Sequence, residues 1–284
     1  MPELPDLLYV QKYLRQQVTG KSVTSFTIKK PVVLRVASEQ TPQQMLVGKT
    51  IRDAAVHGPF LRFGLEPNVE VIMNLMLAGK LQHQRPGEKA EGHLCCSFTL
   101  SDGSSLNLCD QELMAKVYLV PSGQYGTIPK YERQGVDILS ADFTKSLFRQ
   151  LATAHRRKQV RVFINDHTIL SAIGNAYADE ILFGAGIHPK TFVAKLSPEG
   201  IDTLYHCTKN VMQWGIDQVE KAGQPIHVKV RDHMKVRNRK GEPCPRCGST
   251  IRREGVRGHD VYFCPECQPA TRKLFLDWRN VSES

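Results

Sequence analysis

Two residues at the start of this 284-residue chain, Pro2 and Glu3, could form a nucleophile with its own acid–base partner. If Met1 is removed, Pro2 carries a free secondary amine beside a carboxylate, and such an amine can attack a sugar carbon. The same two residues also fit a plain structural role, because a proline near a chain start keeps the first residues extended before a helix. Residues far downstream must decide between these two interpretations.

A second group consists of four cysteines in two Cys-x-x-Cys pairs, CPRC and CPEC, separated by sixteen residues: Cys244, Cys247, Cys264 and Cys267. This spacing is typical of a tetrahedral zinc site with four thiolate ligands, and a site closed by four protein ligands is structural. We therefore expect one structural Zn²⁺ per chain. Two disulfides in a secreted module would be the alternative, but the N-terminus lacks a signal-peptide pattern. The other cysteines (Cys95, Cys96, Cys109 and Cys207) are expected to be small apolar fillers.

A third candidate is the stretch SAIGNAYADEILFGAGIHP, where Gly174 and Asn175 precede a helical pattern. Glycine lets backbone N–H groups approach a phosphate, and a helix N-terminus adds partial positive charge. Asn175 could donate to a phosphate oxygen or simply cap the helix. Taken alone, this stretch fits a plain helix cap better than a phosphate site.

The net charge of the chain favours a polyanionic partner. Lys and Arg total 38 against 28 Asp and Glu, which gives a formal charge of +10 at pH 7. Nucleic acid is the simplest such partner, and a merely basic soluble protein is the alternative. No apolar run approaches the roughly 18 residues of a membrane span. We therefore expect no membrane association and a cytoplasmic location.

The elements that must position these groups change in type along the chain. Residues 6–18 have the apolar spacing of an amphipathic helix with Asp6 as a plausible cap, and strand patterns follow at 23–30, 50–58, 60–65, 69–77, 95–100, 105–110 and 116–121. Short strands at this spacing indicate a β-sandwich or barrel. Residues 122–141 are rich in Gly, Pro and Ser and form the expected boundary. Helical patterns follow at 141–154, 159–166, 175–186 and 197–223.

The segment between the cysteine pairs predicts two short strands, 249–254 and 259–263, joined by a turn with Gly258. Arginines crowd this hairpin, and a run of Lys and Arg lies before it at 229–240. A zinc-held hairpin of this kind suits insertion into a DNA groove. A solvated basic face is the alternative.

Three separated motifs, MPELPD, IGNAYADEILFGAGIHP and GEPCPRCGSTIRR…YFCPECQ, resemble those of the formamidopyrimidine-DNA glycosylase/endonuclease VIII (Fpg/Nei) family, in the expected order over nearly the whole chain. The resemblance implies an α+β protein: an N-terminal β-sandwich with flanking helices (1–125), a helical helix–two-turn–helix domain (140–225) and a zinc-finger β-hairpin (240–270). DNA would cross between the domains. The chain is thus identified as a divergent member of that family.

The resemblance also implies roles for single residues. In the family the processed N-terminal proline attacks C1′ of a damaged nucleotide, and Pro2 matches it; Glu3 matches the acid–base carboxylate. Asn175 matches a phosphate-binding residue. Arg161 lies where the family often has a basic residue, so it too is expected to contact DNA. The implied activity is excision of oxidised bases from double-stranded DNA and nicking of abasic sites by β-elimination, which requires flipping of the base.

Several positions depart from the family pattern. Pro59 stands where the family has a lysine, and residues 110–115 lack both arginines and the phenylalanine that fill the gap left by the base. Leu77 could still wedge into the base stack. His259 aligns with a phosphate-gripping arginine of the finger, and Arg257 is a possible substitute. The region 223–240 is short for a loop that caps oxidised purines, which favours pyrimidine lesions or abasic DNA.

Two functions therefore compete. One is a glycosylase and abasic-site lyase that uses Pro2 and Glu3 and works as a monomer. The other is a DNA-binding lesion sensor of the same fold whose catalysis has weakened. A zinc-ribbon RNA binder rests on charge alone.

Overall fold

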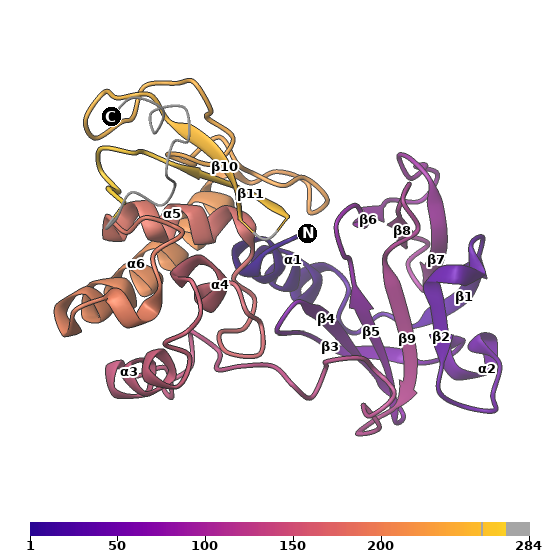
Figure 1. Cartoon of the computed structure of the whole chain (residues 1–284). Helices are drawn as coiled ribbons and strands as arrows, with labels where there is room; N and C mark the ends of the chain where they lie inside the picture. Colours follow the sequence, from indigo (N-terminus) through magenta and orange to yellow (C-terminus); the bar gives the residue numbers. More distant parts are fainter. Residues whose placement is uncertain (257, 271–284) are drawn as a thin grey trace, which may run out of the picture.

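The computed structural model describes residues 1–256 and 258–270, which form two lobes with the N-terminus between them (Figure 1). One lobe is a sandwich of two sheets, and the other is a group of helices that carries a two-stranded hairpin. The predicted α+β class, with a sandwich before a helical part, is confirmed. None of the helices in the described ranges is long and apolar enough to cross a membrane.

The sandwich consists of a five-stranded and a four-stranded sheet. The five-stranded sheet has the order β2 (Leu34–Val36), β9 (Lys116–Pro121), β5 (Val69–Asn74), β4 (Phe60–Glu66) and β3 (Thr50–His57). The four-stranded sheet has the order β1 (Val23–Ile28), β7 (Leu94–Leu100), β8 (Ser105–Cys109) and β6 (Lys80–Gln84). Neighbouring strands are antiparallel except for the parallel pair β2–β9. The short helix α2 (Pro42–Leu46) lies against β1.

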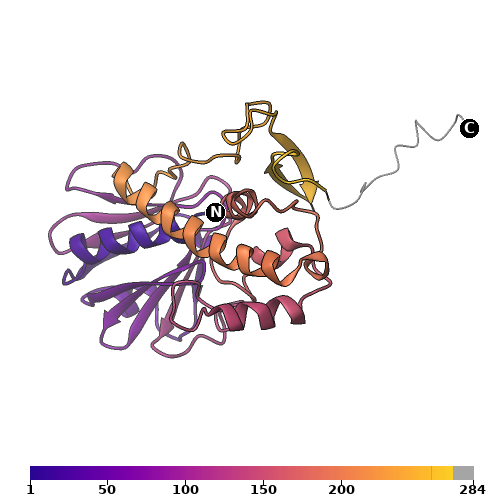
Figure 2. The ribbon, with the colours of Figure 1, turned by 90° about the vertical axis from the view of Figure 1, so that its left-hand side faces the viewer.

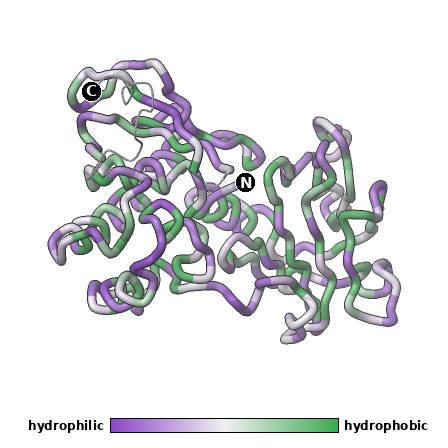
Figure 3. The backbone as a smooth tube through the Cα atoms, in the orientation of Figure 1, coloured by the Kyte–Doolittle hydropathy of each residue, from purple (hydrophilic) through white to green (hydrophobic). Residues whose placement is uncertain are grey.

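Apolar side chains from both sheets fill the space between them and form one continuous core, which includes Phe26, Phe63, Met73, Phe98 and Leu106. Figure 3 shows the hydrophobic residues concentrated along these strands and along the helices of the other lobe. Cys95, Cys96 and Cys109 are buried in this lobe, as expected of apolar fillers, and Cys207 is partly buried.

The strand patterns found the sandwich but missed two strands, because β2 has only three residues and β6 is mostly polar. The predicted strand 69–77 also runs too far. β5 ends at Asn74, whose Oδ1 accepts from Met76 N at 3.0 Å, and Met76 has a φ of 48°. Leu77 therefore lies in a turn.

The second lobe contains α3 (Lys145–Ala154), α4 (Val160–Ile164), α5 (Asn175–Ala185) and the long α6 (Pro198–Ala222). Helices α4 and α5 are joined by turns over 165–174, which is the expected helix–two-turn–helix arrangement. Helix α5 packs directly on α6. An added Cβ at Gly215 of α6 would lie 2.2 Å from the Tyr177 ring, so only glycine fits there.

Helix α1 (Leu4–Gln17) belongs to both lobes. Leu4 lies in the helical core, and Leu7, Val10 and Leu14 lie in the sandwich core. The helix also packs along α6 (Figure 2). The prediction of Asp6 as the helix cap is wrong, because the helix begins at Leu4 and its cap residue is Glu3.

The hairpin consists of β10 (Arg252–Val256) and β11 (His259–Phe263). The first strand starts later than predicted. Residues 244–249 form a turn instead, in which Cys244 N donates to Ser249 O at 2.8 Å.

Candidate active site

A cleft lies where the two lobes and the hairpin meet. Its inner part has a volume of about 480 Å³. The chain start, the turn after β5, the start of α5 and the segment between α6 and β10 line it. Its residues include Glu3, Leu77, Asn175, Lys229, Arg231 and His259. An adjoining part of about 680 Å³ extends between the sandwich and α4 and includes Pro59, Lys116 and Tyr118. Met1, Met76, Met114, Asn165 and His167 line both parts.

The Glu3 carboxylate sits on the N-terminus of α5. Its two oxygens accept from the backbone N–H groups of Gly174 (3.1 Å), Ala176 (2.8 Å) and Tyr177 (3.1 Å). These groups have no partner inside the helix, and the positive end of the helix dipole favours an anion there. Burial raises the pKa of Glu3, while Arg231 and these N–H groups oppose the rise. The carboxyl is therefore a group that can hold a proton at a higher pH than an exposed glutamate.

Gly174 is required for this contact. An added Cβ would lie 2.3 Å from Glu3 Cδ. Gly174, not Asn175, is the N-cap residue of α5. The side chain that caps this helix is that of Glu3, from the start of the chain. The expectation that Asn175 caps this helix is therefore wrong.

Asp6 fixes the backbone on which Glu3 stands. Its Oδ2 accepts from Glu3 N at 2.8 Å, and both its oxygens accept from the Arg231 guanidinium at 2.9 and 2.6 Å. Arg231 also lies over the Tyr177 ring, with its Cζ 5.6 Å from the ring centre. Paired ionic hydrogen bonds of this kind give both energy and fixed geometry.

The amino terminus lies at the mouth of the cleft. Pro2 is buried, and the Met1 amine donates to Leu77 O at 3.3 Å. Burial and the nearby Lys229 ammonium lower the pKa of the Met1 amine to about 6. A terminal amine in this place is largely unprotonated at neutral pH.

Asn175 is held by Arg161. Arg161 Nη2 donates to Asn175 Oδ1 at 2.9 Å, and Arg161 Nε donates to Asp179 at 3.0 Å. Arg161 is only 3% exposed, so its guanidinium is used inside the protein. Because the Asn175 oxygen accepts this bond, the amide nitrogen is the group left to donate to a ligand.

The wedge candidate Leu77 is 63% exposed, and Met114 from the 110–115 segment is 41% exposed on the same cleft. His259 is exposed at the start of β11 and lines both parts of the cleft. Arg257 lies outside the described residues.

Pro59 lies in the turn between β3 and β4. It lines the cleft but provides neither a charge nor a hydrogen-bond donor there.

Several cations of the basic run and of the hairpin have partners within the protein. Besides Arg231 with Asp6, Arg237 Nη1 donates to Asp179 at 2.7 Å and Arg253 pairs with Asp260 at 3.0 Å. The alternative of a merely solvated basic face does not describe Arg231 and Arg237, which attach the finger segment to the helices.

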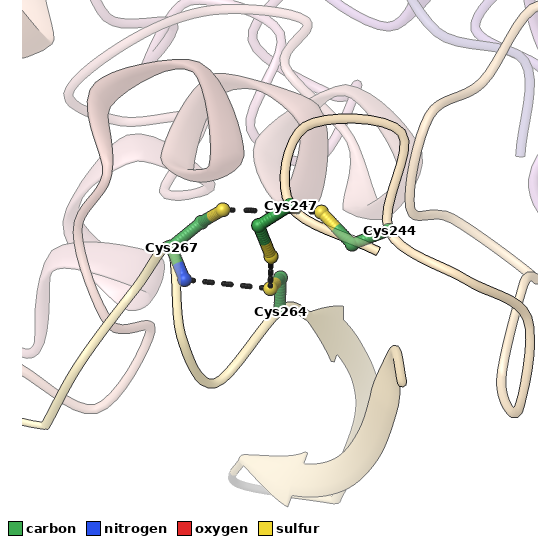
Figure 4. Close-up of side chains that lie close together, drawn as sticks. All are labelled: Cys244, Cys247, Cys264 and Cys267. Carbon is green, nitrogen blue, oxygen red and sulfur yellow. Dashed lines mark hydrogen bonds between the residues drawn. The ribbon is translucent and has the colours of Figure 1, made fainter. Parts of the chain in front are cut away.

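The four cysteines of the finger form one cluster. Their Sγ atoms all lie within 4.8 Å of one another, and the Sγ–Sγ distances are 3.9 Å for Cys244–Cys267 and 3.5 Å for Cys247–Cys264 (Figure 4). Four sulfurs around Zn²⁺ at about 2.3 Å require separations of about 3.8 Å, so the residues fit the metal. With no ligand position left over, the zinc is structural.

Sequence reasoning missed most of the supporting residues. The sequence pattern identifies Asp6 only as a possible cap, and Lys229 and Arg231 only as members of a basic run. Asn165 and His167, which line the cleft, carried no recognisable signal. An acidic residue three positions after Glu3 and an arginine near the end of the sequence become partners only through the fold.

Comparisons with known proteins agree with this geometry. The formamidopyrimidine-DNA glycosylase N-terminal domain model matches residues 1–117, its H2TH domain model matches 134–225, and the zinc finger found in FPG and IleRS matches 241–270. The formamidopyrimidine-DNA glycosylase of Heliobacterium modesticaldum is 30% identical, over 94% of this chain and 100% of that protein. That of Pelotomaculum thermopropionicum is 29% identical, over 94% and 99%.

Two solved structures are also similar. The Fpg protein of Thermus thermophilus has a TM-score of 0.81 at 27% identity and covers 94% of this chain and 98% of its own. A complex of the Lactococcus lactis Fpg with DNA containing an abasic site has a TM-score of 0.85 at 25% identity and covers 95% and 100%. With three domain models in order and a relative of this identity matched end to end, the chain belongs to the formamidopyrimidine-DNA glycosylase family, whose fold, DNA-repair class and zinc finger it shares.

Proposed function

We propose that the chain is a DNA repair glycosylase and abasic-site lyase in which Pro2, after removal of Met1, is the nucleophile and Glu3 is the acid–base group. The observation that carries this proposal is the position of the Glu3 carboxylate. Its carboxylate is bound to the N-terminus of α5 beside the chain start, in a cleft wide enough for an extruded nucleotide. The partner is double-stranded DNA with a damaged base or an abasic site.

The chemistry follows from these two groups. The lone pair of the Pro2 nitrogen forms a bond to C1′, the base leaves with the electrons of the C1′–N bond, and the N–H proton of Pro2 is lost to the departing base, so the nitrogen regains a lone pair. Glu3 donates a proton to O4′ as the sugar ring opens, which leaves an iminium between Pro2 and C1′. The iminium acts as an electron sink, so that loss of a C2′ proton expels the 3′ phosphate. The raised pKa of Glu3 supports its role as the donor.

DNA contacts would come from both sides of the cleft. The Asn175 amide donates to a phosphate, and His259 takes the place of the finger arginine. Arg257, outside the described residues, is a second candidate there. Arg161 acts indirectly by orienting Asn175, because it is itself buried against Asp179. Leu77, with Met114 beside it on the cleft, enters the base stack.

The three functional units are the segments 1–125, 140–225 and 240–270, with catalysis in the first and DNA binding in the other two. The protein works as a monomer in the cytoplasm. Residues 223–240 form no helix or strand and leave little chain for a capping loop, which supports a preference for pyrimidine lesions or abasic DNA over oxidised purines.

Borohydride trapping tests the proposal. The mature protein is incubated with duplex DNA containing one abasic site and reduced, and covalent adducts are separated on a denaturing gel. We expect an adduct with the natural chain, and none with Pro2→Gly or with a chain that retains Met1.

Asn175→Ala is the matched control, because it should weaken binding while leaving the adduct at saturating protein. Binding of abasic duplex without any adduct would support the weakened lesion sensor instead, and absence of both would contradict either function.

A further inference from the structure

One cation stands next to the chain start, and nothing in the sequence marks it. Lys229 lies in the segment between α6 and β10 and lines the inner cleft together with Met1, Glu3 and Leu77. Its Nζ donates to Leu77 O at 2.9 Å, and this is the same oxygen that accepts from the Met1 amine. The Met1 amine and the Lys229 ammonium therefore lie close together, because both donate to the Leu77 carbonyl oxygen.

Two other charged groups near the terminus have partners of their own. Glu3 from the chain start is bound to α5, and Arg231 is bound bidentately to Asp6 of α1. Lys80 at the start of β6 faces Lys229, and His167, Arg237 and His259 line the same cleft at its other walls. Among the described residues on this cleft, Lys229 is the cation that shares a hydrogen-bond acceptor with the amino terminus.

A cation in this place has a definite electrostatic effect. Protonation of the terminal amine would put a second positive charge beside the Lys229 ammonium in a half-buried site, and like charges at this range oppose each other. In agreement, burial and then Lys229 lower the pKa of the Met1 amine, and the pKa of Lys229 itself is lowered, chiefly by burial. The Pro2 nitrogen follows the Met1 amine by one residue along the chain, so removal of Met1 leaves a new terminal amine near the same cation. The turn between β3 and β4 offers no cation for this purpose, because Gly58 and Pro59 occupy it.

We propose that Lys229 is a positioning residue of the reaction, whose charge keeps the terminal imino nitrogen of Pro2 unprotonated and therefore nucleophilic. The inference rests on the proposed function, since it requires Pro2 to be the attacking group. The Leu77 carbonyl holds Lys229 in place, so the exposed Leu77 side chain and the nucleophile are anchored through one turn. Insertion of Leu77 into DNA and activation of the amine would then depend on the same contact.

The test is the pH profile of iminium formation. The mature protein, in excess over a duplex with one abasic site, is mixed with cyanoborohydride between pH 5.5 and 9, and the single-turnover trapping rate is measured. The variants are Lys229→Met, which keeps an unbranched side chain of similar length without the charge, and Lys229→Arg, which keeps the charge. Lys240→Met, an exposed lysine of the same basic run, is the matched control.

We expect the profile of Lys229→Met to move upward by about one pH unit. For a terminal amine with a pKa of about 6, trapping should then fall about threefold at pH 6.5 and about eightfold at pH 5.5, and it should recover at pH 9. Lys229→Arg and Lys240→Met should follow the natural profile. An unchanged profile of Lys229→Met, or an equal loss at every pH, would overturn the role of Lys229. Failure of the natural protein to trap at any pH would instead overturn the proposed function, so the two failures are distinguishable.

Discussion

At the scale of single residues, Glu3 both joins the two lobes and lines the candidate active-site cleft. Its carboxylate accepts N–H groups that lie 171 to 174 positions away, and Leu4 N adds a bond to Ala172 O at 3.1 Å. A carboxyl group attached in this way cannot move without loosening the contact between the lobes. The close approach at Gly174 is what makes the arrangement possible.

Gly174→Ala should therefore damage both stability and catalysis. The new Cβ would displace the carboxylate and leave buried N–H groups unpaired, which costs about 1–3 kcal/mol of unfolding free energy. Trapping of abasic DNA should fall strongly at every pH. Urea denaturation and single-turnover trapping measure the two effects, with Gly126→Ala as control because nothing lies within 4 Å of its added Cβ. A Gly174→Ala protein with natural stability and activity would contradict this account of Glu3.

At the scale of elements, helix α5 contacts the chain start and the finger along its whole length. Its N-terminus binds Glu3. Its middle binds the finger segment, because the Glu180 carboxylate accepts from the N–H groups of Lys235, Val236 and Arg237 at 2.9–3.0 Å. Near its C-terminal end, Gln268 joins the finger to the helix by accepting from Cys264 N and donating to Ile187 O.

Local sequence patterns predicted these elements but not the contacts between them. The spacing of apolar residues revealed α5 and α6, and the cysteine pairs revealed the zinc site, because these signals depend on neighbours along the chain. The role of Asp6, the burial of Arg161 and the proximity of Lys229 to the terminus depend on residues brought together from distant segments. No periodicity encodes such contacts, so sequence reasoning assigned Arg161 and the basic run directly to DNA.

Glu180→Gln tests the attachment of the finger segment. The amide keeps one acceptor oxygen and places an NH₂ group against a backbone N–H, which should lower the unfolding free energy by about 1–3 kcal/mol. Amide hydrogen exchange at residues 235–237 should accelerate. The control is Glu220→Gln, an exposed glutamate paired with Lys12, where a change within about 0.5 kcal/mol is expected. Equal effects of the two variants would argue against a special role of Glu180.

At the scale of the whole molecule, one buried and three partly buried histidines link folding to pH. Burial lowers the pKa of His83, His167, His188 and His233, two of which (His167 and His233) lie beside the active-site helices. A lowered pKa means that the unfolded chain binds protons more readily, so stability is full above about pH 6.5 and is lost as the pH falls below it. The raised pKa values of Glu3 and Glu180 act in the opposite direction.

His188 isolates the histidine contribution. It is 6% exposed, its ring packs edge-on against Phe263, and its Nδ1 accepts from Lys190 N at 3.2 Å, which an imidazolium cannot do. Acidification from pH 7 to 5 should therefore cost about 1–2 kcal/mol at this residue. In His188→Asn the amide oxygen can accept the same bond without titrating, so the decline in unfolding free energy should become shallower by that amount.

The measurement is urea denaturation at constant ionic strength, because the chain already carries a charge of +10 and acid adds to it. His206→Asn, at an exposed position on α6, is the control and should keep the natural slope. If His188→Asn and the natural protein lost stability in parallel, protonation of His188 would not contribute. The acid sensitivity would then have to come from histidines nearer the cleft, where it would also affect catalysis.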